Sequence, residues 1–160
     1  MKVVRARKRN MDEAGILDLL SRAEVGQLAT AGPDCKPYVI PVCFFYEDGR
    51  IYIHCALNGK KLDNIRANPG VSFSVFEVLG MGVGADRPCN SWAYYRSVVA
   101  SGRARILGGD EKLRPLRLLA EKFAHGPVAE MPSDSVGRTC VVEITIDEVC
   151  GKKNEKNKPL

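Results

Sequence analysis

The stretch "YIHCALNGKKLDNIR", residues 52–66, brings a histidine, a glycine, two adjacent lysines and an arginine close together. An alternating apolar run ends at His54, and a helical pattern begins after Gly59. The first-turn amides of a helix and its dipole favour a bound anion. Lys60 and Lys61 add positive charge there, and Gly59 lets the backbone approach a ligand closely. The segment therefore indicates a phosphate site, although paired lysines on an exposed helix also occur without a ligand.

His54 is open to two interpretations. A histidine at a strand end is commonly a structural side chain, but next to the lysines it could donate to a bound heterocycle or transfer a proton. Metal binding is disfavoured, because His54 and Cys55 are neighbours on a strand and point to opposite faces. The six cysteines have neither a C-x-x-C pair nor a zinc spacing, so we interpret them as reduced, mostly buried thiols.

Two other segments carry residues that could bind a ligand. "GMGVGA" follows a predicted strand, but no helix pattern follows it, so it is not a dinucleotide-binding turn, and its glycines indicate a flexible loop.

"SWAYYRSVVASGRARI" contains aromatic residues that could stack on a ring, and Arg96 or Ser97 could meet a phosphate. The same pattern is typical of an ordinary sheet surface. No Ser-His-Asp order, carboxylate pair or Walker motif stands out, which disfavours hydrolysis and the use of nucleoside triphosphates.

A predicted mainly β domain must position these residues. Period-two alternation predicts strands at 25–30, 37–46, 50–55, 71–79, 91–107 and 139–152. The turn at Asp48-Gly49 is expected to join the second and third strands into a hairpin, and Pro37 and Pro41 place the first arm at an edge, bulge or corner. Helical spacing predicts helices within 11–23, 58–68 and 110–125. This order favours a small antiparallel barrel or Greek-key sheet with peripheral helices.

The length of 160 residues fits one domain with a substantial core, and the net charge is +5. Residues 1–10 carry +5 and residues 151–160 carry +3, so residues 11–150 carry −3. We therefore expect a folded domain at 11–150 between a basic N-terminal arm and a basic, disordered tail, with solvated ends rather than nucleic-acid contacts. Because no apolar run could span a bilayer and "MKVVRARKRN" has no signal-peptide core, a cytoplasmic protein is expected.

A resemblance to a known family is carried by four segments, "VGQLAT", "KPYVIPVCFFYEDGRIYIHCALNGKKLDNIRANPGVSF", "CNSWAYYRSVVASGRARI" and "VVEITIDEVCGKK". In this order they resemble the pyridoxamine 5′-phosphate oxidase-like flavoproteins, and among these the nitroimidazole-resistance branch, over residues 5–153. The resemblance implies a six-stranded antiparallel Greek-key split barrel and a homodimer. It also implies FMN bound in a groove at the subunit interface, with F420 and haem as alternative ligands.

The same resemblance assigns residues by position. It implies that Lys60 and Lys61 bind the phosphate, that His54 and Ala56 lie close to the cofactor, and that His54 is a candidate catalytic residue. Segments along the flavin would contain Leu28, Ala29, Thr30, Pro41 and Val42, and a second segment, in the same or the partner subunit, would contain Tyr95, Ser97 and Val98. The implied activity is FMN-dependent reduction of small electrophilic or nitroaromatic compounds, with NAD(P)H as the electron donor. A non-catalytic flavin- or haem-binding protein is the alternative. The second phosphate-binding set of true pyridoxamine phosphate oxidases is not identified in the sequence.

Overall fold

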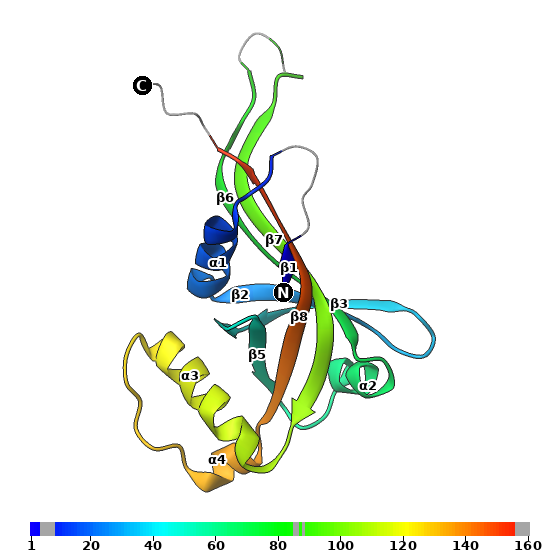
Figure 1. Cartoon of the computed structure of the whole chain (residues 1–160), viewed down its shortest axis with the longest axis vertical. Helices are drawn as coiled ribbons and strands as arrows, with labels where there is room; N and C mark the ends of the chain where they lie inside the picture. Colours follow the sequence, from blue (N-terminus) through cyan, green and yellow to red (C-terminus); the bar gives the residue numbers. More distant parts are fainter. Residues whose placement is uncertain (4–8, 85–86, 88, 156–160) are drawn as a thin grey trace.

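One sheet of eight strands forms the centre of the structure, a computed structural model that describes residues 1–3, 9–84, 87 and 89–155 (Figure 1). The strands are β1 (Lys2–Val3), β2 (Val25–Ala31), β3 (Pro37–Cys43), β4 (Phe45–Glu47), β5 (Arg50–Cys55), β6 (Gly70–Gly82), β7 (Trp92–Leu107) and β8 (Cys140–Asn154). The helices are α1 (Glu13–Arg22), α2 (Lys60–Ala67), η1 (Gly109–Lys112), α3 (Leu113–Ala124) and α4 (Ser133–Gly137). The predicted fold class, an antiparallel β domain with peripheral helices, is confirmed.

The sheet curls into a barrel that stays open along one seam. Its strand order is β3-β2-β6-β7-β8-β5-β4, and all these pairs are antiparallel; β1 pairs in parallel with β8. β3 and β4 lie at opposite ends of this order, yet only Phe44 separates them in the chain. The two edges must therefore meet at Phe44. Among the described strands, no ladder joins β3 to β4 or β5, which leaves the seam split.

The strand count and one pairing differ from the sequence expectation. β1 is additional, and the arm predicted at 37–46 is divided at Phe44 into β3 and β4. The turn at Asp48-Gly49 does join a hairpin, but its partners are β4 and β5. β3 instead pairs with β2 along its full length, from Val25 opposite Cys43 to Ala31 opposite Pro37. Alternation identified these segments as strands, but it does not specify which strand each one pairs with.

The core fills the inside of the curled sheet. α1 begins at its N-cap Asp12, whose side chain accepts a hydrogen bond from the amide of Gly15, and it buries three side chains against the sheet, Ile16, Leu19 and Leu20. α2 buries Leu62 and Ile65 in the same core. A second, smaller cluster lies outside the barrel, where α3 covers three sheet residues, Tyr52, Leu107 and Val141. The helices therefore cover only parts of the sheet, and apolar side chains such as Val39 and Val99 stay exposed on its outer face.

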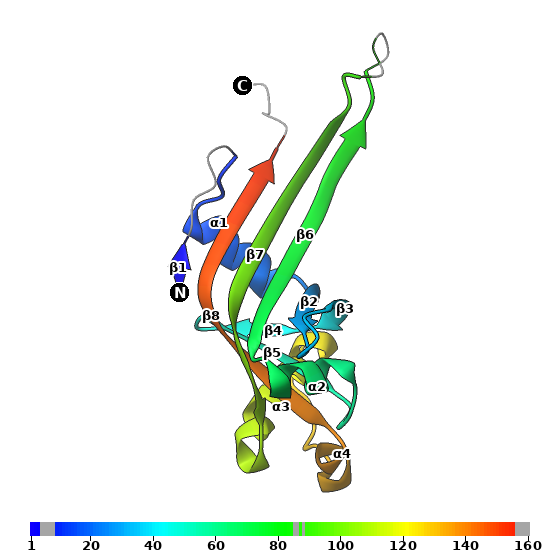
Figure 2. The same ribbon diagram turned by 90° about the vertical axis from the view of Figure 1, so that its right-hand side faces the viewer.

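Strands β6 and β7 extend beyond the rest of the sheet as a projecting arm, which we define as residues 76–84 and 91–97 (Figures 1 and 2). β8 ends at Asn154 opposite Tyr95, so the outer part of the arm has two strands only. Gly80 and Gly82 lie within β6, opposite Tyr94 and Trp92, and not in a loop as expected from "GMGVGA".

Two further sequence expectations need correction. Residues 151–154 lie in the predicted disordered tail, although the last predicted strand already reached residue 152; they belong to β8 and pair with β7. The cysteines are free thiols, but only Cys140 is buried; Cys35, Cys43 and Cys89 are exposed and two are partly buried.

Candidate functional site

A pocket of about 510 Å³ opens at the seam of the barrel. Three structural units form it: β3, the end of β5 with the start of α2, and the junction of α4 with β8. Its lining residues are Pro41, Val42, Cys43, His54, Cys55, Ala56, Lys61, Arg138 and Thr139. Five of them, Pro41, Val42, His54, Ala56 and Lys61, were candidates from the sequence. We call this hollow the seam pocket.

The two walls of the seam pocket come together because the sheet is curled. Pro41 lies in the row that runs through Gln27, Ser74 and Val99. His54 lies in the row that runs through Val141 to Leu107. The seam pocket therefore lies where β3 and β5 face each other across the unpaired seam.

The N-terminus of α2 borders this pocket. Gly59 is the N-cap with φ +141°, a conformation that favours glycine, and no atom lies within 4 Å of where its Cβ would stand. No side chain caps the helix, so its first amides are available to an anion. Lys61 lines the pocket, whereas Lys60 lies near Asp34, whose pKa it helps to lower after the larger effect of the Lys36 amide hydrogen bond. The two predicted lysines therefore do not act on the same place, because Lys61 lies at the pocket and Lys60 lies near Asp34.

Arg138 and Thr139 were not among the sequence candidates. The register Cys55 opposite Cys140 brings the residues before β8 next to the end of β5. Lys112 fixes this junction by donating to the carbonyls of Val136 (2.7 Å) and Thr139 (2.9 Å). Arg138 is exposed and pairs with Asp134 at 2.9 Å. Only knowledge of the β5–β8 register could have indicated that these residues reach the pocket.

His54 and Cys55 present different chemistry to the pocket. The imidazole of His54 is exposed, and we find no hydrogen bond from it to the described part of the chain. Cys55 is partly buried, and burial raises the pKa of its thiol to about 11, although Lys61 acts in the opposite direction. A thiol with this pKa is protonated at neutral pH and is a poor nucleophile. His54 is therefore the better candidate for proton transfer.

Other predicted cofactor residues lie away from the seam pocket within one chain. The side chains of Leu28 and Val98 are in the core, with 0% and 1% exposure. Thr30 is buried, and its hydroxyl accepts a hydrogen bond from Asn64 at 3.0 Å. Ala29 is half-buried on β2, opposite Val39.

Tyr95 and Ser97 are half-buried on β7, on the same face of the strand as the exposed Val99. Tyr95 is separated from Leu107, which lies at the level of His54, by twelve residues of β7, or about 40 Å of extended strand. The structure does not bring Tyr95 and Ser97 to the seam pocket of their own chain.

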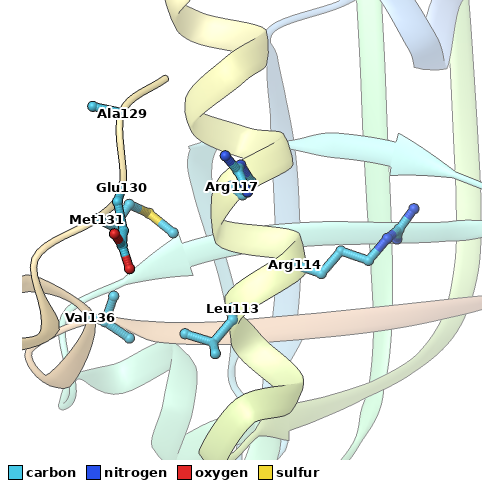
Figure 3. Close-up of a pocket in the computed structure, with 7 residues that line it drawn as sticks. All are labelled: Leu113, Arg114, Arg117, Ala129, Glu130, Met131 and Val136. Carbon is cyan, nitrogen blue, oxygen red and sulfur yellow. The ribbon is translucent and has the colours of Figure 1, made fainter. Parts of the chain in front are cut away.

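A second pocket, of about 370 Å³, lies between α3 and the segment that leads to α4 (Figure 3). Leu113, Met131 and Val136 supply apolar surface, while the side chain of Arg114 points away from them. Arg114 binds both oxygens of Glu47 and lowers the pKa of that carboxyl group. No predicted site residue lines this pocket, and its charges are mostly paired. The seam pocket is therefore the better candidate for a functional site.

The seam pocket is suited to an anionic, partly planar ligand. Lys61 supplies positive charge, Arg138 adds a guanidinium that is paired with Asp134, no Asp or Glu is among the lining residues, and β3 contributes apolar surface. Such a lining fits the phosphate and ring of a flavin mononucleotide. Among the residues that the structure describes, no group of three or more His, Cys, Asp or Glu side chains could hold a metal ion. No described helix is long and apolar enough to cross a membrane.

The model of a protein family described as pyridoxamine 5′-phosphate oxidase matches residues 12–153. Among solved structures, an FAD-binding protein from Mesorhizobium loti is 27% identical, with a TM-score of 0.69 over 92% of this chain and 98% of the other. An FAD- and haem-binding protein from Mycobacterium smegmatis is 19% identical, with a TM-score of 0.80 over 95% and 77%. A candidate 5-nitroimidazole antibiotic resistance protein from Bacteroides thetaiotaomicron is 20% identical, with a TM-score of 0.74 over 88% and 83%. At 19–20% identity these last two show a shared fold.

Proposed function

Because the chain belongs to the pyridoxamine 5′-phosphate oxidase family, we propose that it is an FMN-dependent oxidoreductase that reduces small electrophilic or nitroaromatic compounds. The observation that carries this proposal is the lining of the seam pocket. Lys61, Arg138 and the uncapped amides of α2 surround a space without acidic side chains. When bound there, FMN would supply the hydride or electron transfer, with NAD(P)H as the donor, and the protein would bind and orient it.

Five of the residues that line the seam pocket have a role in this proposal. Lys61 and the first amides of α2 bind the phosphate, since charged hydrogen bonds to phosphate are among the strongest in proteins. Pro41, Val42 and Ala56 offer apolar surface to the ring. His54, exposed at the pocket, is the candidate proton donor to a reduced substrate. Lys60 adds to the positive field but faces Asp34, so we expect it to contribute less than Lys61.

We further propose that the protein is a homodimer that packs through the bare outer face of the sheet. This face presents exposed apolar side chains on three strands, Val39, Phe76, Val78 and Val99. Tyr95 and Ser97 lie on the same face, far from their own seam pocket along β7. A second copy across this face would bring them to the pocket of the partner subunit, as the family resemblance implies. Such a contact is isologous, because both copies use the same patch.

The first test is an ultraviolet–visible spectrum of the purified protein, followed by titration with FMN. We expect a flavin spectrum and saturable binding, and a protein that stays colourless throughout the titration would exclude an FMN enzyme. Lys61→Ala should weaken FMN binding by about 1.5–3 kcal/mol, because a charged hydrogen bond is lost. Lys60→Ala should have a smaller effect. Arg117→Ala, at the other pocket, is the matched control and should leave the affinity unchanged.

The dimer is tested by sedimentation. Val99→Arg introduces like charges at the centre of the outer face and should yield monomers. Leu113→Arg, which changes an exposed apolar residue elsewhere, is the control. A wild-type protein that sediments as a monomer at all concentrations would rule out the dimer.

A non-catalytic flavin- or haem-binding protein is the alternative, because one structural neighbour binds both FAD and haem. The two functions differ in turnover. The oxidoreductase should consume NAD(P)H in the presence of a nitroaromatic acceptor, and its flavin should be bleached anaerobically by NAD(P)H. A flavin that neither nicotinamide cofactor reduces would favour the binding protein. The same spectrum distinguishes FMN from haem and F420 by their different absorption bands.

A further inference from the structure

Two cysteines face each other where the β5–β8 ladder ends. Cys55 is the last residue of β5, Cys140 is the first residue of β8, and the register pairs the two directly. Residues directly opposite each other in an antiparallel ladder point to the same face of the sheet. The burial agrees, since Cys140 belongs to the main core cluster and Cys55 packs against that same cluster. Both are free cysteines, so two thiols lie side by side at this end of the ladder.

The backbone at this pair suits a disulfide. Directly opposite residues of an antiparallel ladder have Cα atoms about 4.5–5.5 Å apart, and disulfides join Cα atoms that are about 4.4–6.8 Å apart. In the middle of a ladder, hydrogen bonds on both sides would resist the adjustment that a bridge needs. This pair is the last of its ladder, and Cys140 also precedes Val141, the first residue of β8 that pairs with β7. The chain beyond the pair is therefore free to adjust.

The two thiols differ in their access to solvent. Cys140 is 6% exposed, so a dissolved oxidant does not reach it directly. Cys55 is partly buried and lines the seam pocket together with Lys61. Burial raises the pKa of the Cys55 thiol, Lys61 lowers it, and the adjacent Cys140 thiol raises it further. Cys55 is therefore the thiol that an oxidant meets first, and Cys140 is the neighbour that can close a bridge.

We propose that Cys55 and Cys140 are a redox-active pair, which a low-molecular-weight disulfide oxidises to a disulfide bridge in the wall of the seam pocket. The Cys55 thiolate attacks one sulfur of the oxidant, for example glutathione disulfide, and displaces one glutathione. The Cys140 thiolate then attacks the Cys55 sulfur and displaces the second glutathione. The protein loses two electrons and two protons, and these leave with the two glutathione molecules. This inference goes beyond the proposed function and does not depend on FMN binding.

The bridge links two walls of the seam pocket. It joins the end of β5, which carries His54 and leads to α2, to the strand start that directly follows Arg138 and Thr139. It also removes the free thiol of Cys55 from the vicinity of Lys61. A thiol reductant that cleaves the bridge restores the open pair. The redox state of the surroundings therefore acts on the pocket through this pair.

The first test locates the bridge by peptide mass spectrometry. In the double variant Cys35→Ser and Cys150→Ser, each remaining cysteine lies in a different tryptic peptide. After incubation with glutathione disulfide, we expect peptide 51–60, which contains Cys55, to be joined to peptide 139–152. Dithiothreitol should separate the two peptides again. The wild-type chain should give the same result when the joined peptide is fragmented, so the test does not depend on the folding of the variant.

Cys43 is the internal control for this test. It is exposed and lines the same pocket from β3, so the oxidant reaches it at least as easily as it reaches Cys55. Because no ladder joins β3 to β5 among the described strands, Cys43 should acquire glutathione without joining Cys55. A bridge between Cys43 and Cys55 would overturn the proposed pair, and so would a protein in which Cys55 forms no bridge.

The second test separates the roles of the two thiols. In Cys140→Ala the reaction should stop at a mixed disulfide of Cys55 and glutathione, because the thiol that closes the bridge is absent. In Cys55→Ala the buried Cys140 should acquire glutathione at least about tenfold more slowly than Cys55 does in Cys140→Ala. Equal rates in the two variants would contradict the order of attack and overturn the inference.

The third test asks whether the fold accommodates the bridge. Oxidation should raise the urea midpoint of the wild-type chain, because the bridge closes the long segment 56–139 into a loop in the unfolded state. Cys55→Ala, treated with glutathione disulfide in the same way, is the matched control and should show no such rise. A lower midpoint after bridge formation would mean that the bridge distorts the ends of β5 and β8. That result would overturn the inference that the fold holds the pair ready for oxidation.

Discussion

Lys122 of α3 clamps the chain at Phe44, the single residue where the two edges of the barrel meet. Its ammonium group donates to the Phe44 carbonyl at 3.1 Å and to the Ala23 carbonyl, and it lies 4.6 Å from the centre of the Phe44 ring. Burial lowers the pKa of this lysine. One side chain thus ties α3 to the ends of α1 and β3, next to the wall of the seam pocket.

We expect Lys122→Met to reduce the free energy of unfolding by about 1–3 kcal/mol, because two partly buried carbonyls lose their donor while most of the side-chain length is kept. Urea denaturation followed by circular dichroism measures this loss. Lys36→Met is the control, since Lys36 is exposed and pairs only with Asp34 among the described residues. If Lys122→Met is as stable as Lys36→Met, the clamp does not hold the seam.

Gly102 lies at the irregularity in the β7–β8 ladder, opposite Ile146. A Cβ at this position would stand 2.1 Å from the Thr145 carbonyl oxygen, so backbone would have to move against backbone. Gly102→Ala should therefore lower the free energy of unfolding by about 1–3 kcal/mol or prevent folding. Gly108→Ala meets no atom within 4 Å and should change stability by less than about 0.5 kcal/mol. Thermal unfolding of both variants measures this difference. If Gly102→Ala and Gly108→Ala are equally stable, the close approach of the Thr145 carbonyl to Gly102 is contradicted.

Local patterns in the sequence were sufficient for the elements but not for their partners. The apolar spacing of α1 and α2 and the alternation of β5 to β8 each depend on neighbouring residues, and these elements form where they were predicted, except that β6 and β8 continue to Gly82 and Asn154. The pairing of β3 with β2 depends on the crossing at Phe44. Pro37 and Pro41 correctly indicated an edge or corner in this arm, but alternation continues without a break from Tyr38 to Tyr46 and does not show that the strand changes edges at Phe44.

The same contrast between local patterns and long-range pairing applies to the candidate site. His54, Ala56 and Lys61 are close in sequence, so a strand-end and helix-start pattern was enough to group them. Arg138 reaches them only through the register of β5 and β8, which residue types do not encode locally. Thr30 was predicted to lie along the flavin, but its hydroxyl accepts a hydrogen bond from Asn64, which is 34 residues away in the chain. The sequence could not indicate this long-range contact.

The hydrogen bond between Thr30 and Asn64 allows a test of whether Thr30 stabilises the fold or contacts the cofactor. Asn64 is 1% exposed, and its Oδ1 atom has no hydrogen-bond partner among the described residues, so Thr30 is the side-chain partner that it has. Thr30→Val should cost about 1–3 kcal/mol of unfolding free energy, because the Asn64 amide is left buried without an acceptor. Thr30→Ser keeps the hydroxyl and should cost less. A Thr30→Val protein of normal stability with weakened FMN binding would show instead that Thr30 contacts the cofactor.

The thiol of Cys55 provides a pH-dependent test of the seam pocket. Because burial raises its pKa to about 11, the thiolate fraction at pH 8 is on the order of one part in a thousand. With Cys35, Cys43 and Cys89 changed to Ser, alkylation of Cys55 by iodoacetamide, located by peptide mass spectrometry, should rise about tenfold per pH unit toward pH 11. Lys61→Ala should slow it, since Lys61 lowers this pKa.

The same shift affects stability with a definite sign. The thiol has a pKa of 9.0 in the unfolded chain and of about 11 in the folded protein. Its contribution to the free energy of unfolding is therefore fully present below about pH 9 and is lost as the pH rises toward 11. Cys55→Ala should therefore lose stability less steeply than the parent between pH 9 and pH 11 in urea denaturation, whereas equal slopes would contradict the raised pKa. An alkylation rate that levels off near pH 9 would contradict the raised pKa of the Cys55 thiol.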